Sequence, residues 1–200
     1  MKLYIKSGAC SLAPHIALRE AGLSFELVKV DLATKKLEDG SDYLAINPKG
    51  QVPALALDDG TVLTEAAVLL QYIADQAPEA KLLPAGGIDR YKALGWLNFV
   101  STELHKGFGP LFRPNTPEEY KPIVRQTLID KYTLLDRELA GREYLAPTGF
   151  SVADAYCFVT LLWAKFVKLD IGHLANVAAY QARIADRPAV KAALTAEGLA

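Results

Sequence analysis

The stretch that decides the fold runs from Asn47 to Ala66 and reads NPKGQVPALALDDGTVLTEA. A first apolar run ends at Leu57 and a second begins at Val62, with the pair Asp59-Gly60 between them. Asp-Gly between two apolar runs is a strong β-hairpin signal. The stretch therefore predicts a loop, a strand, a tight turn, a second strand and the start of a helix.

The same stretch offers groups that suit a small peptide carrying both charges. An X-Pro bond is the only common cis peptide, and a proline before a strand donates no ladder hydrogen bond. We therefore expect a cis bond at Val52-Pro53, which turns the N–H and C=O of Val52 outward to pair with an extended ligand. We expect Thr64 to cap the next helix, whose first N–H groups would bind a carboxylate. Glu65 beside them would hold an ammonium group.

Composition excludes several classes of function. The 200 residues allow one large domain or two small ones, and the net charge of −1 gives no basic field for nucleic acid or membrane. The longest mostly apolar run, residues 152–164, is too short to span a bilayer. We expect no signal peptide, since Lys6 and Ser7 arrive before any long apolar region. Two cysteines make no disulfide framework and no Cys/His cluster has metal-ligand spacing, so we expect a cytoplasmic protein without a metal.

The first eighty residues alternate strands and helices. Residues 2–6 read as a buried strand, followed by a helix that begins at Cys10 or Ser11 and ends at Gly22. Residues 25–30 read as a second strand, parallel to the first. Residues 31–45 are polar and ambiguous, with room for a short helix before the hairpin, and residues 65–76 form the next helix.

Beyond this part no strand signal is convincing. Residues 77–87 hold two prolines and two glycines and mark the best domain boundary. We expect long helices over residues 89–107 and from a capping box at Thr116 to Leu139, then a nearly apolar central helix that starts at Ser151 with Asp154 reaching back. Two further helices cover residues 174–186 and 189–197. The expected domains are residues 1–80, a linker at 81–87, and an all-helical domain over 88–200.

At this point the residues resemble a known family. The order β-α-β-α-β-β-α is similar to a thioredoxin-like fold, and with an all-α C-terminal domain it resembles a cytosolic glutathione transferase. The resemblance is to the bacterial beta class and covers essentially the whole chain. The motifs that carry it are Gly8-Ala9-Cys10-Ser11-Leu12, Pro14-His15, Leu18-Arg19-Glu20, residues 47–53, Leu63-Thr64-Glu65, Trp96-Leu97-Asn98, Glu103-Leu104-His105-Lys106-Gly107 and Val152-Ala153-Asp154-Ala155-Tyr156.

The resemblance implies that glutathione is the co-substrate. Its cysteinyl backbone would pair at Val52-Pro53, its γ-glutamyl end would meet Glu65 and Ala66, and Lys35 would hold its glycyl carboxylate, with Lys49 the weaker candidate for that task. The remaining positions that match the family's glutathione contacts are Cys10, Asn98, Thr102, Glu103, Leu104, His105 and Lys106. Members of the family are homodimers, and the position of Glu103 can serve the partner subunit's site.

The expected reaction joins the sulfur of glutathione to a small electrophile. Cys10 lies between a strand and a helix start, where the helix dipole favours a thiolate. The N-terminus of the first helix, Cys10, Ser11 and His105 are the groups available to stabilise the sulfur of glutathione. A largely apolar electrophile would lie near Leu104, Phe108, Phe112 and Trp163.

Other interpretations remain open at this stage. Cys10 would also support thiol–disulfide exchange through a mixed disulfide with glutathione. Ala13 stands where a dithiol motif needs its second cysteine, which disfavours a dithiol mechanism but permits this one. A non-enzymatic interaction protein on the same fold is the third alternative. Cys157 reads as core packing and His15 as a structural histidine. The sequence does not identify the electrophile.

Overall fold

A computed structural model describes all 200 residues, and these form two compact units. Unit 1 comprises residues 1–85 and 188–200, and unit 2 comprises residues 86–187. The boundary between residues 85 and 86 lies within the stretch expected as a linker. Residues 188–200 differ from expectation, because we placed them in the helical domain and they pack in unit 1.

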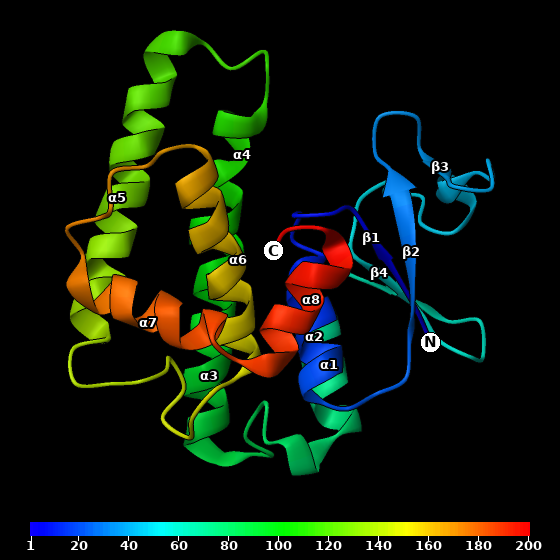
Figure 1. Ribbon diagram of the computed structural model, residues 1–200, viewed down its shortest axis with the longest axis horizontal. Helices are drawn as coiled ribbons and strands as arrows, with labels where there is room; N and C mark the ends of the chain where they lie inside the picture. Colours follow the sequence, from blue (N-terminus) through cyan, green and yellow to red (C-terminus); the bar gives the residue numbers. More distant parts are fainter. The chain divides into compact units, whose positions relative to one another are not determined.

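Unit 1 is built on a five-stranded mixed sheet with the strand order β3-β2-β1-β4-β5 (Figure 1). Strand β1 runs parallel to β2, as predicted, and antiparallel to β4. The remaining neighbours pair antiparallel. The strands are β1 (Lys2–Ile5), β2 (Glu26–Asp31), β3 (Lys36–Leu37), β4 (Ala54–Ala56) and β5 (Val62–Thr64).

Three helices of unit 1 lie together beside this sheet, with α1 packed against both α2 and α8 (Figure 1). They are α1 (Leu12–Glu20), α2 (Ala66–Gln76) and α8 (Pro188–Glu197), and two 3-10 turns, η1 (Tyr43–Ala45) and η2 (Pro78–Ala80), complete the unit. Helix α8 belongs here because Val190 and Ala193 are fully buried and the side chain of Glu197 is buried against the start of α1.

The hairpin of the deciding stretch is confirmed. Strands β4 and β5 pair in register from Ala54 opposite Thr64 to Ala56 opposite Val62, and Gly60 in the turn has φ +87°, a conformation that glycine adopts without steric cost. The bond Val52-Pro53 is cis, as expected. The predicted cap at Thr64 is wrong, because Thr64 is the last residue of β5 and the N-cap of α2 is Glu65.

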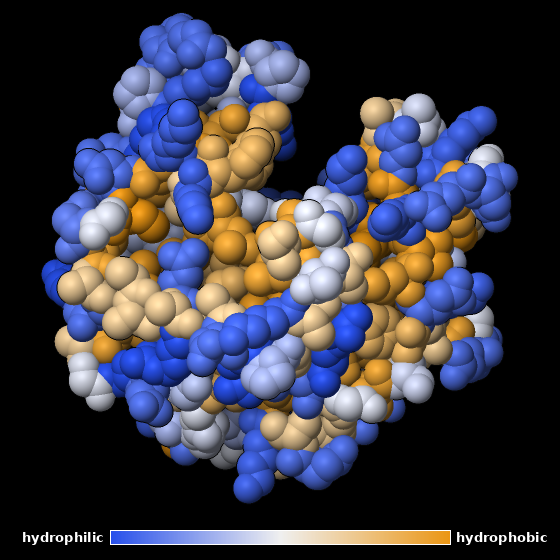
Figure 2. Space-filling view, viewed as in Figure 1, coloured by the Kyte–Doolittle hydropathy of each residue, from blue (hydrophilic) through white to orange (hydrophobic).

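The ambiguous residues 31–45 form the short strand β3 and the turn η1. Figure 2 shows mostly hydrophilic residues over the visible surface of this region. Strand β3 has only two residues, of which one is exposed and one half-buried. A strand this short shows no alternation of polar and apolar residues, so no local pattern indicates it.

Unit 2 is entirely helical. Its elements are α3 (Gly87–Phe99), the π-helical turn η3 (Val100–His105), α4 (Lys106–Phe112), the 3-10 turn η4 (Glu118–Tyr120), α5 (Lys121–Glu138), α6 (Val152–Phe166) and α7 (Ala175–Ala185). The predicted helix over 89–107 thus continues to Phe112 through a π-helical turn. None of the helices in either unit is long and apolar enough to cross a membrane.

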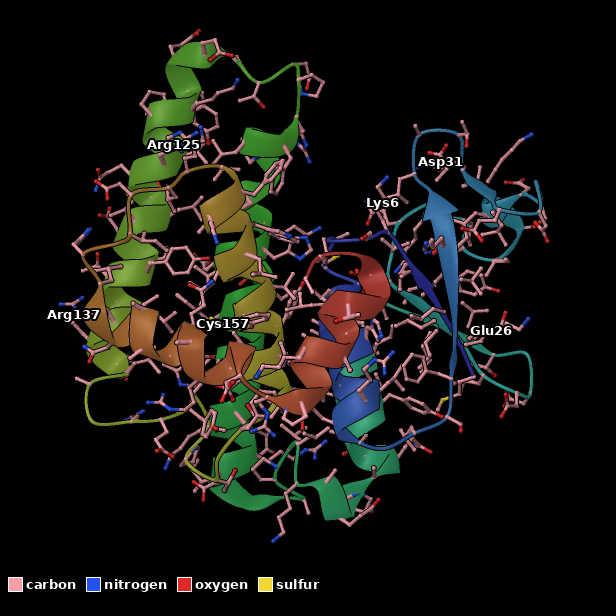
Figure 3. All side chains as sticks on the ribbon, viewed as in Figure 1. Lys6, Glu26, Asp31, Arg125, Arg137 and Cys157 are labelled. Carbon is pink, nitrogen blue, oxygen red and sulfur yellow. The ribbon has the colours of Figure 1, made fainter.

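Helix α6 is the buried centre of unit 2, as predicted, and Figure 3 shows Cys157 on it, inside the unit. The carboxylate of Asp154 accepts a hydrogen bond from the backbone N–H of Ser151 at 2.8 Å, so the expected capping box is present. The capping box predicted at Thr116 is absent, because η4 intervenes and α5 begins only at Lys121.

Candidate functional site

Cys10 and Val52, which the sequence placed in one site, are in contact. The thiol of Cys10 lies 3.2 Å from the carbonyl oxygen of Val52 and donates a hydrogen bond to it. Cys10 lies in the turn before α1 and is 8% exposed. The contact makes Cys10 a hydrogen-bond donor to the residue that precedes the cis proline.

Ser11 is bonded within the turn that precedes α1. Its side chain is fully buried, and its hydroxyl both donates to the carbonyl of Lys6 and accepts from the N–H of Lys6, each at 3.2 Å. These two bonds close the turn that leads from β1 to α1. The structure thus shows the Ser11 hydroxyl bonded to the backbone of Lys6, whereas we expected it to be available to the sulfur of glutathione.

Glu65 carries the most unusual backbone in the candidate site. It is the N-cap of α2 with φ +71° and ψ +118°, a region that non-glycine residues rarely adopt and that is often found at functional sites. Its side chain does not cap the helix and is 56% exposed. The ammonium group of Lys49 lies 2.8 Å from its carboxylate and 3.0 Å from the hydroxyl of Thr64. The carboxylate that we expected to hold a ligand ammonium thus holds a lysine.

Lys35 also lies against the deciding stretch. Its ammonium group donates to the carbonyl of Gly50 at 2.7 Å, and a Cβ added at Gly50 would lie 3.3 Å from the Lys35 side chain. Gly50 has φ +61°, so both the backbone and the close approach favour glycine there. The expected unit 1 residues Cys10, Lys35, Val52 and Glu65 therefore all lie on or against residues 47–66.

The expected residues of unit 2 lie around the π-helical turn η3. Asn98 is exposed in the last turn of α3, and the hydroxyl of Thr102 donates to its carbonyl at 3.0 Å. Glu103 is exposed and pairs with Lys131 of α5 at 2.7 Å, and Lys106 is exposed at the start of α4. A π-helical turn is rare and occurs frequently at functional sites. The sequence carried no signal for it, because a π-helical turn differs from an α-helical turn by one extra residue and needs no particular residue types.

His105 is fixed by α6. Its Nδ1 forms a hydrogen bond with the hydroxyl of Tyr156, which is 1% exposed. The imidazole also packs edge-on against Trp163 with ring centres 5.0 Å apart. Sequence reasoning missed Tyr156 as a site residue, although it quoted Tyr156 in a motif, because nothing in the sequence brings residues 105 and 156 together.

The rings expected to line an electrophile pocket form one aromatic group. Phe112 packs on Phe108 with ring centres 6.0 Å apart and on Trp163 at 5.6 Å. Phe108 and Leu104, which we expected beside the ligands, are fully buried in this group. The surface of this group is formed by Phe112, 44% exposed, and by Phe166, 78% exposed, which the sequence did not single out.

His15 is a structural histidine, as predicted. Because the Nε–H of Arg19 donates to its Nε2 at 2.8 Å, the proton of the imidazole lies on Nδ1, which donates to Glu197 at 2.8 Å. The same carboxylate accepts from the N–H of Gly8 at 3.0 Å, and the hydroxyl of Ser7 donates to the carbonyl of Glu197. These bonds hold the turn before Cys10 from the C-terminal end of the chain.

Comparisons with known proteins agree with this arrangement. Residues 8–76 match the glutathione S-transferase N-terminal domain, and residues 99–188 match the glutathione S-transferase C-terminal domain. The chain is 56% identical to glutathione S-transferase GstA of Escherichia coli O157:H7 over 200 residues, which cover all of both chains. These similarities favour neither the exchange reaction nor the interaction protein as the main function.

Two solved structures are also similar over the full length of both chains. A sphingomonad glutathione S-transferase complexed with glutathione is 53% identical with a TM-score of 0.96. The bacterial beta class glutathione S-transferase of Sphingomonas chungbukensis is 51% identical with a TM-score of 0.96. The chain therefore belongs to the glutathione S-transferase family, with neighbours in its bacterial beta class.

Proposed function

We propose that this protein is a glutathione S-transferase that joins the thiol of reduced glutathione to small, largely apolar electrophiles. The observation that carries the proposal is the gathering of Cys10, Lys35, Val52 and Glu65 along residues 47–66, within a chain of this family. In the reaction the sulfur of glutathione attacks the electrophilic carbon, a C–S bond forms, the leaving group departs with its electron pair, and the thiol proton passes to solvent.

Unit 1 offers complementary charges for the tripeptide. We assign the γ-glutamyl ammonium to Glu65 and the neighbouring α-carboxylate to the backbone N–H of Ala66 at the start of α2, where the helix dipole favours an anion. Val52 would pair with the cysteinyl backbone, and Lys35 would release Gly50 to hold the glycyl carboxylate. This order of charges sets the direction in which the tripeptide lies.

The position of Cys10 suggests how the sulfur is stabilised. When an N–H of the ligand takes over the carbonyl of Val52, the thiol of Cys10 is released to donate to the glutathione sulfur. A donor that meets developing negative charge favours the thiolate, which is the nucleophile. His105, held by Tyr156, is the second donor in this proposal.

Unit 2 contributes the remaining groups. We assign Asn98, Thr102, Glu103 and Lys106 to polar contacts, since all four are exposed around η3. For the electrophile we assign the aromatic group that ends in Phe112 and Phe166, because exposed rings favour a flat aromatic substrate.

We further propose a homodimer in the cytoplasm. Neither cysteine takes part in a disulfide, which suits a reducing compartment where glutathione is also reduced. Sedimentation should give twice the 21.7 kDa mass of one chain, and a monomer at micromolar concentration would contradict the dimer.

The test measures conjugation of glutathione to a chlorodinitrobenzene by the absorbance of the thioether. We expect saturable turnover, and Glu65→Gln should raise the KM for glutathione about tenfold because a charge-assisted hydrogen bond is lost. The matched control is Glu26→Gln, an exposed glutamate on β2 at 61% exposure. Absence of turnover with a panel of haloaromatic and epoxide substrates would contradict the proposal.

A further inference from the structure

The ion pair between Lys49 and Glu65 occupies the carboxylate that the proposed function gives to the substrate. The Lys49 ammonium lies 2.8 Å from Glu65 Oε1 and also donates to the Thr64 hydroxyl at 3.0 Å. Both side chains are about half exposed, Lys49 at 53% and Glu65 at 56%. The geometry is that of one ammonium bound at the start of α2.

The backbone of Lys49 is held while its side chain is exposed. Its N–H donates to Oδ1 of Asn47 at 3.1 Å, and the Asn47 side-chain amide donates to the carbonyl of Gln51 at 2.7 Å. Asn47 is 1% exposed and Gly50 N–H donates to its carbonyl at 2.8 Å, so the loop is internally bonded. The loop therefore keeps Lys49 within reach of Glu65, and the exposed side chain can swing away without disturbing the fold.

We propose that Lys49 is a specificity-determining residue that competes with the substrate ammonium for Glu65. The proposal rests on the proposed function, which places the γ-glutamyl ammonium on this carboxylate. Glutathione binds by replacing Lys49, whereas a tripeptide without the α-amino group leaves the Lys49–Glu65 pair in place. Lys49 thus lowers the affinity for glutathione, leaves the affinity for a ligand without an ammonium group unchanged, and so reduces the preference of the site for glutathione over such an analogue.

The sign of the effect separates this role from a direct contact. If Lys49 instead held a carboxylate of the ligand, its removal would weaken the binding of both glutathione and its desamino analogue. Competition predicts that removal of Lys49 strengthens the binding of glutathione and changes that of the analogue little. The expected change in affinity is about two- to fivefold, which corresponds to the free energy of an exposed ion pair.

The experiment uses the full chain and two probes, reduced glutathione and glutaryl-cysteinyl-glycine, which keeps both carboxylates but has no ammonium. Calorimetry gives the Kd of each probe for the wild type, Lys49→Met, Lys49→Arg and Lys36→Met. Lys36 is an exposed lysine on β3, so its variant makes the same change in net charge. Lys49→Gln serves as a second neutral variant, and melting temperatures check that each variant is folded.

We expect Lys49→Met and Lys49→Gln to raise the preference for glutathione over its analogue about two- to fivefold, with the KM for glutathione lowered and kcat unchanged. Lys49→Arg and Lys36→Met should keep the wild-type preference. An unchanged or reduced preference in the two neutral variants overturns the competition while leaving the proposed function intact. Failure of the wild type to bind glutathione at all would overturn the proposed function itself.

Discussion

The two cysteines differ in what surrounds their sulfur atoms. Burial raises the pKa of the Cys157 thiol to about 12, with the nearby Asp154 carboxylate adding to the shift. At pH 8 about one Cys157 side chain in ten thousand is then a thiolate. Because the thiolate is the reactive form, Cys157 should not react in the folded protein.

Alkylation with iodoacetamide at pH 8 should therefore label Cys10 and leave Cys157 unmodified in the native chain. Peptide mass spectrometry locates the label, and the variant Cys10→Ala should take up none. In denaturant both cysteines should react. Native labelling of Cys157 below pH 9 would contradict the burial of this side chain.

The Cys10 thiol should matter differently for two reactions. Cys10→Ser keeps a hydrogen-bond donor but cannot form a mixed disulfide, so exchange with a glutathione disulfide should vanish while conjugation stays within about tenfold of wild type. Cys10→Ala also loses the donor, and conjugation should fall a further tenfold or so. Equal losses of both activities in the serine variant would contradict this division.

For single residues, the sequence indicated which positions are of interest better than it indicated which residues they contact. The sequence singled out Cys10 between a strand and a helix, Val52 before a proline, and Glu65 at a helix start, because local chemistry marks such positions. The Lys49–Glu65 pair, the buried hydroxyl of Ser11 and the Tyr156–His105 hydrogen bond depend on contacts between distant residues, which no local pattern encodes.

Helix α8 holds the turn before Cys10 through one buried carboxylate. Glu197→Ala leaves the Nδ1–H of His15 and the N–H of Gly8 without their acceptor, so the free energy of unfolding should fall by about 2–4 kcal/mol. Urea unfolding measures the loss. The exposed control Glu26→Ala should change stability by less than about 0.5 kcal/mol.

A double-mutant cycle with His15→Ala checks that the loss runs through this contact. The two substitutions should be non-additive by about 1 kcal/mol or more, as residues in one hydrogen-bond network are. Additive losses would show that Glu197 stabilises the chain in another way.

The packing of α4 on α5 depends on the absence of a side chain at Gly107. A Cβ there would lie 2.9 Å from Cδ2 of Leu128, which is fully buried, so Gly107→Ala should destabilise the protein by about 1–3 kcal/mol. Gly95 in α3 has open space at this position, and Gly95→Ala should stabilise by about 0.5–1 kcal/mol. Melting temperatures that shift in the same direction in Gly107→Ala and Gly95→Ala would contradict the close contact at Gly107.

Elements with a strong periodic pattern were predicted well from the sequence. The β4–β5 hairpin follows from an Asp-Gly turn, and the buried helix α6 follows from a nearly apolar run. The π-helical turn η3 and the 3-10 turn η4 were missed, because both replace part of an α-helix without changing its pattern of residues. The two-residue strand β3 is too short to have a pattern.

For the whole molecule, the division into an α/β part and a helical part follows from the switch in periodicity near residue 80. That α8 belongs to unit 1 does not follow from the sequence, because the chain returns to unit 1 only at Pro188 and an amphipathic helix fits either unit. The carboxylate of Glu197 settles the matter in the structure through its bond to His15, and a sequence shows no such pairing in advance.

The central claim is that glutathione binds along residues 47–66 with its ammonium on Glu65 and its sulfur at Cys10. A crystal structure of the protein with reduced glutathione tests this most directly. We predict that the cysteinyl backbone pairs with Val52, that the γ-glutamyl ammonium contacts Glu65, and that Lys49 has left this carboxylate. A bound glutathione that lies elsewhere, with Lys49 still on Glu65 and Cys10 still donating to Val52, would contradict the account.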